Sequence, residues 1–278
     1  MISRLGYRGL DALMRAFNRW RGLRLDPKVS QAEQYYAVMY RTFLSRAIPE
    51  LIDGSRSLQV LDVGCGSGRF LIELAGSGHR VTGLDYMKDA LDMARAQAQK
   101  AGIDLDLRQG DALAILSKLE SASQDVVLSF EALYVIAAFR DVMAEMVRVL
   151  KPGGFIACSH RPKFYFITSL LRKGDTKAAL KVARANEGVI SLKSLPVYYN
   201  WQTRGQLEAL YTQLGTEVRG LYPIGMFSGI GADGMSAIAG PENLDAAQLS
   251  DLLELECQEF DEYATTSRYT LVIARKPL

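Results

Sequence analysis

Three glycines at alternate positions follow a short apolar run in this 278-residue chain and precede a stretch with helical periodicity. The run Val60–Val63 leads into Gly64, Gly66 and Gly68, and Asp62 stands two residues before the first of these glycines. Glycine permits a positive φ and lets a ligand approach the main chain closely, while the start of a helix supplies N–H groups that lack intrahelical partners. The spacing therefore predicts a ligand-binding turn at the carboxyl edge of a parallel sheet.

Two more aspartates follow predicted strands farther along the chain. Asp85 ends the strand-like segment Arg80–Asp85, 21 residues after Gly64, where a carboxylate can accept hydrogen bonds from both hydroxyls of a ribose. Asp111 follows the next strand-like segment. A dinucleotide fingerprint requires G-x-G-x-x-G, and Arg69 occupies its sixth position, so the spacing disfavours a dinucleotide.

The pattern D-x-G-x-G-x-G and four later motifs, in this order, resemble the class I S-adenosylmethionine-dependent methyltransferases over roughly residues 58–160. The later motifs are Gly83-Leu84-Asp85-Tyr86, Gln109-Gly110-Asp111-Ala112, Asp125 to Leu133, and Arg148 to Phe155. The resemblance implies S-adenosylmethionine as cofactor, with Asp85 at the ribose and Asp111 and the Ala112 N–H at the adenine. Tyr36 and Phe130 are aromatic residues that could face the sulfonium or stack on the acceptor. The full set of expected cofactor-binding residues is Tyr36, Asp62, Gly64, Cys65, Gly66, Gly68, Asp85, Tyr86, Asp111, Ala112 and Phe130.

Strand-like and helix-like segments alternate through residues 58–160, which is typical of an α/β doubly wound sheet with helices on both faces. The resemblance implies a Rossmann-like sheet of seven strands whose last strand, Arg268–Ala274, is antiparallel. Residues 1–57 are expected to form an N-terminal helical cap and residues 58–278 the methyltransferase domain. Insertions at about 161–200 and 226–266 are expected to set acceptor specificity, and the acidic stretch 241–262 is predicted to form a helix capped near Asn243.

The expected reaction is in-line transfer of a methyl group to a small, apolar or aromatic acceptor. The transfer depends mainly on positioning, and a base is needed only if the acceptor must lose a proton. His160 is the candidate base, because it follows the fifth predicted strand and an imidazole titrates near neutrality; the alternative is a histidine that only hydrogen-bonds a loop. No metal is expected, since Glu131 and the pair His160-Arg161 make a poor oxygen cage.

Composition limits the classes of protein. Lys plus Arg is 33 and Asp plus Glu is 31, so the formal net charge is +2 and no nucleic-acid partner is expected. The three cysteines lie far apart, and no apolar run reaches the ~18 residues of a membrane span, so a cytoplasmic location is expected. Residues 1–24 carry six arginines among regularly spaced apolar residues, which predicts a basic amphipathic helix.

Other functions remain open at this point. The basic helix of residues 1–24 either packs on the domain or contacts an anionic membrane surface. The second interpretation corresponds to a peripheral membrane methyltransferase that acts on a lipid or a quinone. An RNA or protein methyltransferase and a non-catalytic module that keeps the cofactor site are further alternatives.

Overall fold

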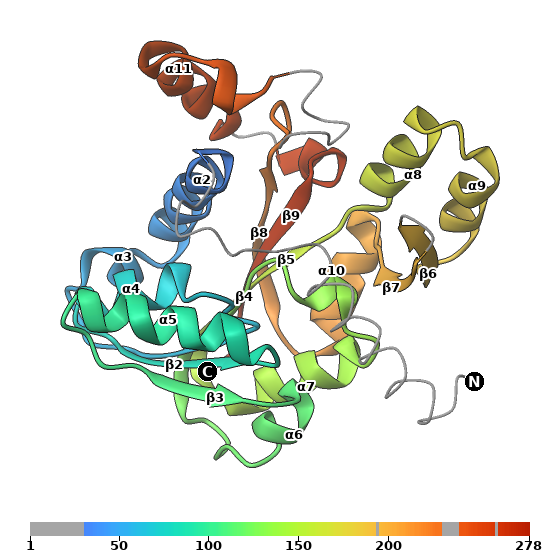
Figure 1. Ribbon diagram of the computed structural model, residues 1–278. Helices are drawn as coiled ribbons and strands as arrows, with labels where there is room; N and C mark the ends of the chain where they lie inside the picture. The colour runs from blue at the N-terminus through green and yellow to red at the C-terminus, as the bar shows by residue number, and fades with distance from the viewer. Residues whose placement is uncertain (1–30, 193–194, 230–238, 259–260) are drawn as a thin grey trace.

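The computed structural model describes residues 31–192, 195–229, 239–258 and 261–278, so the helix predicted within residues 1–24 lies outside the described residues. A seven-stranded sheet runs through the centre of the described part (Figure 1). Its strands are β1 (Gln59–Val63), β2 (Arg80–Asp85), β3 (Asp106–Gln109), β4 (Gln124–Ser129), β5 (Leu150–His160), β8 (Glu217–Ile224) and β9 (Tyr269–Arg275).

The strand order is β3-β2-β1-β4-β5-β9-β8. Strands β1 to β5 pair in parallel, and β9 pairs antiparallel with both β5 and β8. The topology confirms the predicted α/β fold with an antiparallel last strand. Because β1 to β5 are parallel, their carboxyl ends meet at one edge of the sheet, and that edge is where ligands bind in folds of this kind.

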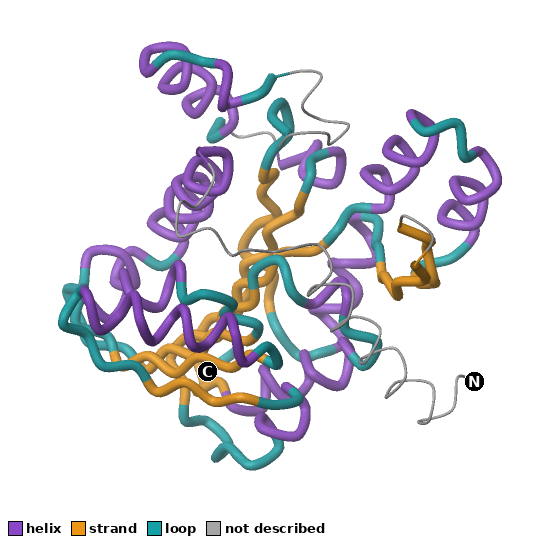
Figure 2. Tube along the Cα trace, in the orientation of Figure 1, coloured by secondary structure: helices purple, strands orange, loops and turns teal. Residues whose placement is uncertain are grey.

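Helices cover both faces of this sheet (Figure 2). One face carries α2 (Gln31–Ala47), α3 (Pro49–Asp53), α4 (Arg69–Gly76) and α5 (Lys88–Lys100), and the other carries α6 (Ala112–Leu116), α7 (Phe139–Val149) and α10 (Arg204–Gln213). The expected cap of residues 1–57 is thus described only for α2 and α3.

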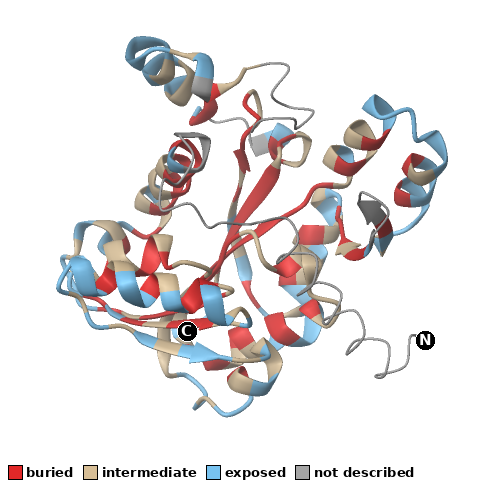
Figure 3. Cartoon of the chain, in the orientation of Figure 1, coloured by how far each residue is buried: buried red, intermediate tan, exposed pale blue. Residues whose placement is uncertain are grey.

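Two apolar cores follow from the alternation of side chains along the strands. Val60 and Val126 belong to the core under α2 and α4, whereas their neighbours Leu61 and Val127 belong to the core under α7 and α10. Figure 3 shows the result: burial is concentrated along the sheet and on the helix faces turned toward it. The sheet is therefore buried on both faces, and this holds its carboxyl edge in a fixed position.

The segment expected as the first insertion forms a unit beside the sheet, at the right of Figure 1. It contains α8 (Lys163–Arg172), α9 (Thr176–Arg184), β6 (Glu187–Leu192) and β7 (Leu195–Asn200), the two strands pairing antiparallel. Its small apolar core is made of Phe166, Leu170, Ala179, Val182, Ile190 and Trp201. Within the described residues, no helix combines the length and apolar character needed to cross a bilayer.

The described part of residues 226–266 contains one α-helix, α11 (Ala246–Glu256). Asp245 caps α11, because its side chain accepts a hydrogen bond from the N–H of Gln248. The cap expected near Asn243 was therefore misplaced by two residues. At the other end of α11, the buried carboxylate of Glu256 accepts hydrogen bonds from the N–H groups of Met226 and Phe227. These bonds tie the helix to the chain that leaves β8.

Candidate functional site

The glycine turn after β1 is held against β2 by its own backbone. The N–H groups of Gly64 and Cys65 both donate to the carbonyl of Leu84, at 2.7 and 3.0 Å. Gly64, Gly66 and Gly68 have φ values of +80°, +55° and +82°, the region that disfavours other residues. The turn therefore needs glycine for backbone conformation at all three positions.

The three glycines differ in their surroundings. A Cβ on Gly64 would lie 2.4 Å from the Cβ of Ala132, so the turn touches the segment that follows β4. A Cβ on Gly66 would meet no atom within 4 Å. The main chain at Gly66 is therefore uncovered, as a backbone that receives a ligand must be.

Asp85, at the end of β2, lies directly beside this turn. Its Oδ2 accepts from the N–H of Gly66 at 2.8 Å, and its Oδ1 accepts from the N–H of Met87 at 2.8 Å. The N–H of Tyr86 also donates to this carboxylate, which leaves a lone pair that can accept from a ligand hydroxyl. The next side chain, Tyr86, is 37% exposed, which is unusual for a large ring and leaves a face for a flat group.

Asp62, on β1, lies beneath the same turn and is 3% exposed. Burial is the main reason that the pKa of Asp62 rises to about 7, the charge of Asp85 adds to the rise, and Arg69 opposes it. Burial also raises the pKa of Asp85, although backbone N–H donors oppose that rise. The turn is thus surrounded by carboxyl groups whose ionised forms would be stabilised by a cation.

Asp111 and Ala112 lie at the carboxyl end of β3, beside β2. Asp111 caps α6, because its Oδ1 accepts from the N–H of Ala114 at 2.9 Å. The side chain is exposed, so one oxygen is engaged by the helix and the group still faces solvent. The structure therefore brings Asp62, Asp85 and Asp111 to the ends of three neighbouring strands, as the motif order predicted.

Tyr36 and Phe130, which were expected to face the sulfonium or the acceptor, lie in the apolar core. Phe130 stacks on Tyr40 at 4.7 Å and meets Phe70 edge-on at 4.9 Å. Tyr36 is buried, and its hydroxyl donates to the carbonyl of Ser228 at 3.1 Å. Tyr40, one turn farther along α2, is thus the tyrosine that contacts the residues after the glycine turn and after β4.

His160 is not brought to this edge as an accessible base. It is fully buried, and its Nε2 lies 2.9 Å from the hydroxyl of Tyr211 on α10. Burial lowers the pKa of His160 to about 3, so the ring is neutral over the physiological range. This placement is closer to the alternative of a histidine that only hydrogen-bonds a loop, although its partner Tyr211 lies on a helix.

A charged cluster that the motifs did not indicate lies at the ends of β4 and β5. Glu131 follows β4 with φ +60°, and its N–H donates to the Ser159 hydroxyl at 2.6 Å. Its carboxylate pairs with Arg69 at 3.2 Å and accepts from the Tyr269 hydroxyl at 2.9 Å. Burial alone would raise the pKa of Glu131, but Arg69, the Tyr269 hydroxyl and Arg161 hold it below its ordinary value.

Arg161 completes the cluster from the end of β5. The side chain is 8% exposed, and its Nη2 donates to the Tyr269 hydroxyl at 2.9 Å. Its guanidinium also lies 4.0, 4.3 and 5.0 Å from the ring centres of Tyr269, Tyr165 and Tyr134, within the range of cation–π attraction. Of these contacts, the sequence shows only that Glu131 follows β4, since Tyr269 lies 138 residues away along the chain.

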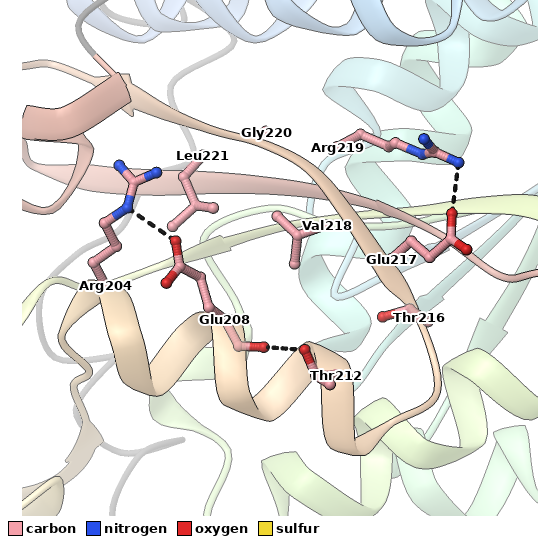
Figure 4. A pocket seen from close by; sticks show the side chains of 9 residues that line it. All are labelled: Arg204, Glu208, Thr212, Thr216, Glu217, Val218, Arg219, Gly220 and Leu221. Carbon is pink, nitrogen blue, oxygen red and sulfur yellow. Dashed lines mark hydrogen bonds and ion pairs between the residues drawn. The ribbon is translucent and has the colours of Figure 1, made fainter.

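A cleft of about 520 Å³ lies elsewhere, between α10 and the outer strand β8 (Figure 4). Its wall carries two ion pairs, Arg204 with Glu208 at 2.9 Å and Arg219 with Glu217 at 2.7 Å. None of the predicted site residues lines it. Charged side chains on an edge strand keep the edge from pairing with other chains, so this cleft has a structural explanation. In the described part of the chain, no group of three or more His, Cys, Asp or Glu side chains could hold a metal ion.

Comparison with known proteins identifies the central segment. The family described as "Methyltransferase domain" matches residues 61–158. The chain is also similar to the ubiquinone biosynthesis O-methyltransferase of Maricaulis maris, with 32% identity over 102 residues, which are 37% of this chain and 40% of that protein. The ubiquinone biosynthesis O-methyltransferase of Nitrosococcus oceani is 36% identical over 110 residues, which are 38% of this chain and 46% of that protein. The match thus spans less than half the length of these relatives.

Solved structures extend the likeness to the rest of the fold. The 1,6-didemethyltoxoflavin-N1-methyltransferase of Burkholderia thailandensis, solved with S-adenosylhomocysteine, superposes with a TM-score of 0.61 at 14% identity, covering 100% of this chain and 92% of that one. A SAM-dependent methyltransferase from Methanosarcina mazei superposes with a TM-score of 0.55 at 19% identity, covering 80% of this chain and 93% of that one. Residues 61–158 therefore match the methyltransferase-domain family, and the chain shares its fold with S-adenosylmethionine-dependent methyltransferases of known structure.

Proposed function

We propose that this protein is a methyltransferase that binds S-adenosylmethionine and methylates a small, apolar or aromatic acceptor. The observation that carries the proposal is the pairing of an uncovered glycine turn with the Asp85 carboxylate, bonded to the N–H of Gly66 at 2.8 Å. A ribose hydroxyl at Asp85 would place the rest of a nucleoside against the same turn. Tyr86 and the Asp111–Ala112 segment would then border its base.

The charges around the turn suit a cation. Asp62, Asp85 and Glu131 supply three carboxyl groups, and Arg69 is the cation whose charge acts on both Asp62 and Glu131. When bound, the cofactor would supply a methyl group already activated on a positively charged sulfur. Ionised carboxylates near that charge favour binding, and a bound cation would in turn lower the pKa of Asp62.

The chain's own part in the reaction is positioning. Gly64 contacts Ala132, so the turn and the segment after β4 form one continuous wall. The Ser159 hydroxyl and the carboxamide of Asn200 hold this segment by its backbone, at Glu131 and Leu133. A wall fixed in this way aligns two reactants, and alignment can contribute ~7–11 kcal/mol toward the barrier.

The class of acceptor is supported by the relatives. Two of them are named ubiquinone biosynthesis O-methyltransferase, and the name indicates a hydroxylated precursor of a lipophilic quinone. Tyrosines 134, 165 and 269 gather around Arg161 where the acceptor would reach the ends of β4 and β5. Aromatic rings of this kind suit a flat, apolar acceptor.

Calorimetry with S-adenosylhomocysteine tests the cofactor assignment. We expect saturable heat with the full-length protein and a loss of affinity of about 100-fold in Asp85→Ala, because hydrogen bonds to a charged group are each worth about 1.5–3 kcal/mol. Asp106→Ala is the matched control, since Asp106 lies on the neighbouring strand and bonds Arg108 in solvent. No heat with the folded wild-type protein would reject the proposal.

We also propose that the protein attaches to an anionic membrane surface, where a lipophilic acceptor would reside. Four large apolar side chains in the first insertion, Phe164, Leu171, Leu180 and Val189, are between 47% and 53% exposed. Two exposed acids lie in the same stretch of chain, Asp175 and Glu187, against five exposed bases: Arg172, Lys173, Lys177, Lys181 and Arg184. Exposed apolar residues amid bases are typical of surfaces that bind anionic lipid.

Sedimentation with phosphatidylcholine vesicles, with and without phosphatidylserine, tests this second proposal. We expect the full-length protein to sediment with the anionic vesicles and the double variant Leu171→Ser/Leu180→Ser to do so several-fold less. Leu255→Ser, an exposed leucine of α11, is the control. If the double variant binds the anionic vesicles as well as the wild type does, and removal of residues 1–24 abolishes that binding, the first insertion is not the membrane contact and the N-terminal segment is.

A further inference from the structure

We infer that Glu131 receives the proton of the acceptor and that the acceptor therefore presents a hydroxyl group at the end of β4. This inference rests on the proposed methyl transfer and assigns its base. The sequence pointed instead to His160, which is fully buried against Tyr211.

Position is the first argument. Glu131 precedes Ala132, whose methyl group lies against the glycine turn, so Glu131 stands beside the wall that would hold the cofactor. Its side chain remains 28% exposed although two partners bind its carboxylate. A side chain that is held by two partners and is still partly exposed can meet a ligand at the end of β4.

Backbone conformation is the second argument. Glu131 is one of two non-glycine residues with positive φ among the described residues, and this conformation is unfavourable for a residue with a side chain. The Ser159 hydroxyl accepts from its N–H and keeps it in place. Strain of this kind clusters at functional sites, because the chain keeps it where a side chain must point in one direction.

The network around the carboxylate is the third argument. Arg69 holds Oε1 and the Tyr269 hydroxyl holds Oε2, so one lone pair remains on each oxygen. Arg161 donates to the Tyr269 hydroxyl and thereby directs its proton toward Glu131. Tyr269 and Arg161 are positioning residues that orient the carboxylate and keep it ionised.

The proton transfer balances without another reactant. As the acceptor oxygen bonds to the methyl carbon, the bond from that carbon to sulfur breaks and the sulfur becomes neutral. The positive charge passes to the acceptor oxygen, whose O–H becomes strongly acidic, and its proton moves to Glu131. A carboxylate of low basicity is sufficient for this step, because the acid formed is far stronger than a phenol. The products are a methyl ether, an uncharged thioether and a neutral Glu131 that returns its proton to water.

Glu187 provides a matched control. Its carboxylate also accepts from a tyrosine hydroxyl, that of Tyr198 at 2.7 Å, and also faces an arginine, Arg140 at 3.6 Å. It stands at the start of β6, away from the strand ends. The variants Glu131→Gln and Glu187→Gln therefore remove the same chemical group from similar surroundings.

The test uses 4-nitrophenol as a probe, because its absorbance reports whether the bound phenol is ionised. With saturating S-adenosylhomocysteine, we expect the apparent pKa of bound 4-nitrophenol to fall by about one unit or more in Glu131→Gln, since an adjacent negative charge that disfavours the phenolate is gone. Glu187→Gln should match the wild type, and Glu131→Asp, which keeps the charge, should restore most of the wild-type value. Once an acceptor is found, Glu131→Gln should lower kcat by about 100-fold.

The outcomes separate this inference from the function on which it rests. If S-adenosylhomocysteine gives no binding heat, the proposed function fails. If it binds and the pKa of bound 4-nitrophenol is the same in wild type and Glu131→Gln, or if 4-nitrophenol does not bind, Glu131 is not the base and the inference is overturned. Should Glu131→Gln fail to fold, Glu131→Met decides by the same comparison with wild type, because it also removes the charge and keeps the length of the side chain.

Discussion

The two halves of the sheet's carboxyl edge hold their charged groups in different ways. At the ends of β1, β2 and β3, carboxylates are bonded to backbone N–H groups: Asp85 to Gly66 and Met87, and Asp111 to Ala114. At the ends of β4, β5 and β9, side chains are bonded to side chains: Glu131 to Arg69 and Tyr269, and Tyr269 to Arg161.

This difference indicates that the two halves of the edge suit different kinds of ligand. A site built from backbone groups is fixed by the fold and suits a ligand of constant shape, which in the proposed function is the cofactor. A site built from side chains can change by substitution without disturbing the strands, and it suits the acceptor, which varies. The comparison predicts that substitutions in the first half act on the cofactor and on stability together, whereas those in the second act on charge and pH dependence.

The largest effect is expected from Gly64→Ala. Its Cβ would lie 2.4 Å from that of Ala132, and φ is +80°, so the turn must move; we expect a loss of more than about 2 kcal/mol in unfolding free energy and loss of S-adenosylhomocysteine binding. Gly66→Ala has the same kind of φ but meets nothing within 4 Å, so it should cost about 1 kcal/mol. Urea unfolding measures the loss of stability in each variant, and calorimetry measures its binding of S-adenosylhomocysteine. Equal losses would show that contact with Ala132 does not distinguish the two.

The next effect concerns Asp62 and pH. The pKa of Asp62 is raised to about 7 in the folded protein, chiefly by burial, so the folded state binds a proton that the unfolded state releases at lower pH. This contribution to stability is present below the ordinary pKa of an aspartate and is lost as pH rises toward 7. We expect Asp62→Asn to flatten the dependence of the urea midpoint on pH between about 4 and 7. An unchanged slope would contradict the raised pKa.

The smallest effect is expected from Tyr269→Phe. Removing the hydroxyl takes a donor from Glu131 and an acceptor from Arg161, and we expect a loss of about 1–2 kcal/mol at neutral pH. Glu131 has a lowered pKa, so its contribution is full above the ordinary pKa of a glutamate and is lost as pH falls through the lowered value. The difference in unfolding free energy between wild type and Tyr269→Phe should therefore become smaller as the pH is lowered. In Tyr198→Phe, where Glu187 is 46% exposed, the loss should stay below about 1 kcal/mol.

Local patterns predicted the elements of the sheet well. Thr203 and Gly215 mark the ends of α10, since Thr203 forms a capping box and Gly215 has φ +74°. The periodicity did not reveal α6, because five residues are too few to show a helical repeat. It also left α8, α9 and the β6–β7 pair inside an undivided insertion, because their apolar residues serve a small core of their own.

The candidate site was predicted unevenly for the same reason. Asp85 and the glycines are recognisable because their roles follow from neighbours in the chain. His160 was chosen from its place after a strand, but which way its ring points depends on Tyr211, 51 residues away. Tyr36 was chosen in preference to Tyr40, although only packing decides which turn of α2 faces Phe130.

The sequence by itself determined the order of strands β1 to β5 along the chain, the glycine turn and the aspartates at the strand ends, because these depend on backbone conformation and on spacing within one βα unit. Only the tertiary structure decided that Glu131, Arg69, Arg161 and Tyr269 form one cluster. Such a cluster arises from side chains of distant segments that pack together, and no local pattern records their meeting. Its charges are stabilised by contacts that exist only after the last strand, β9, has inserted beside β5.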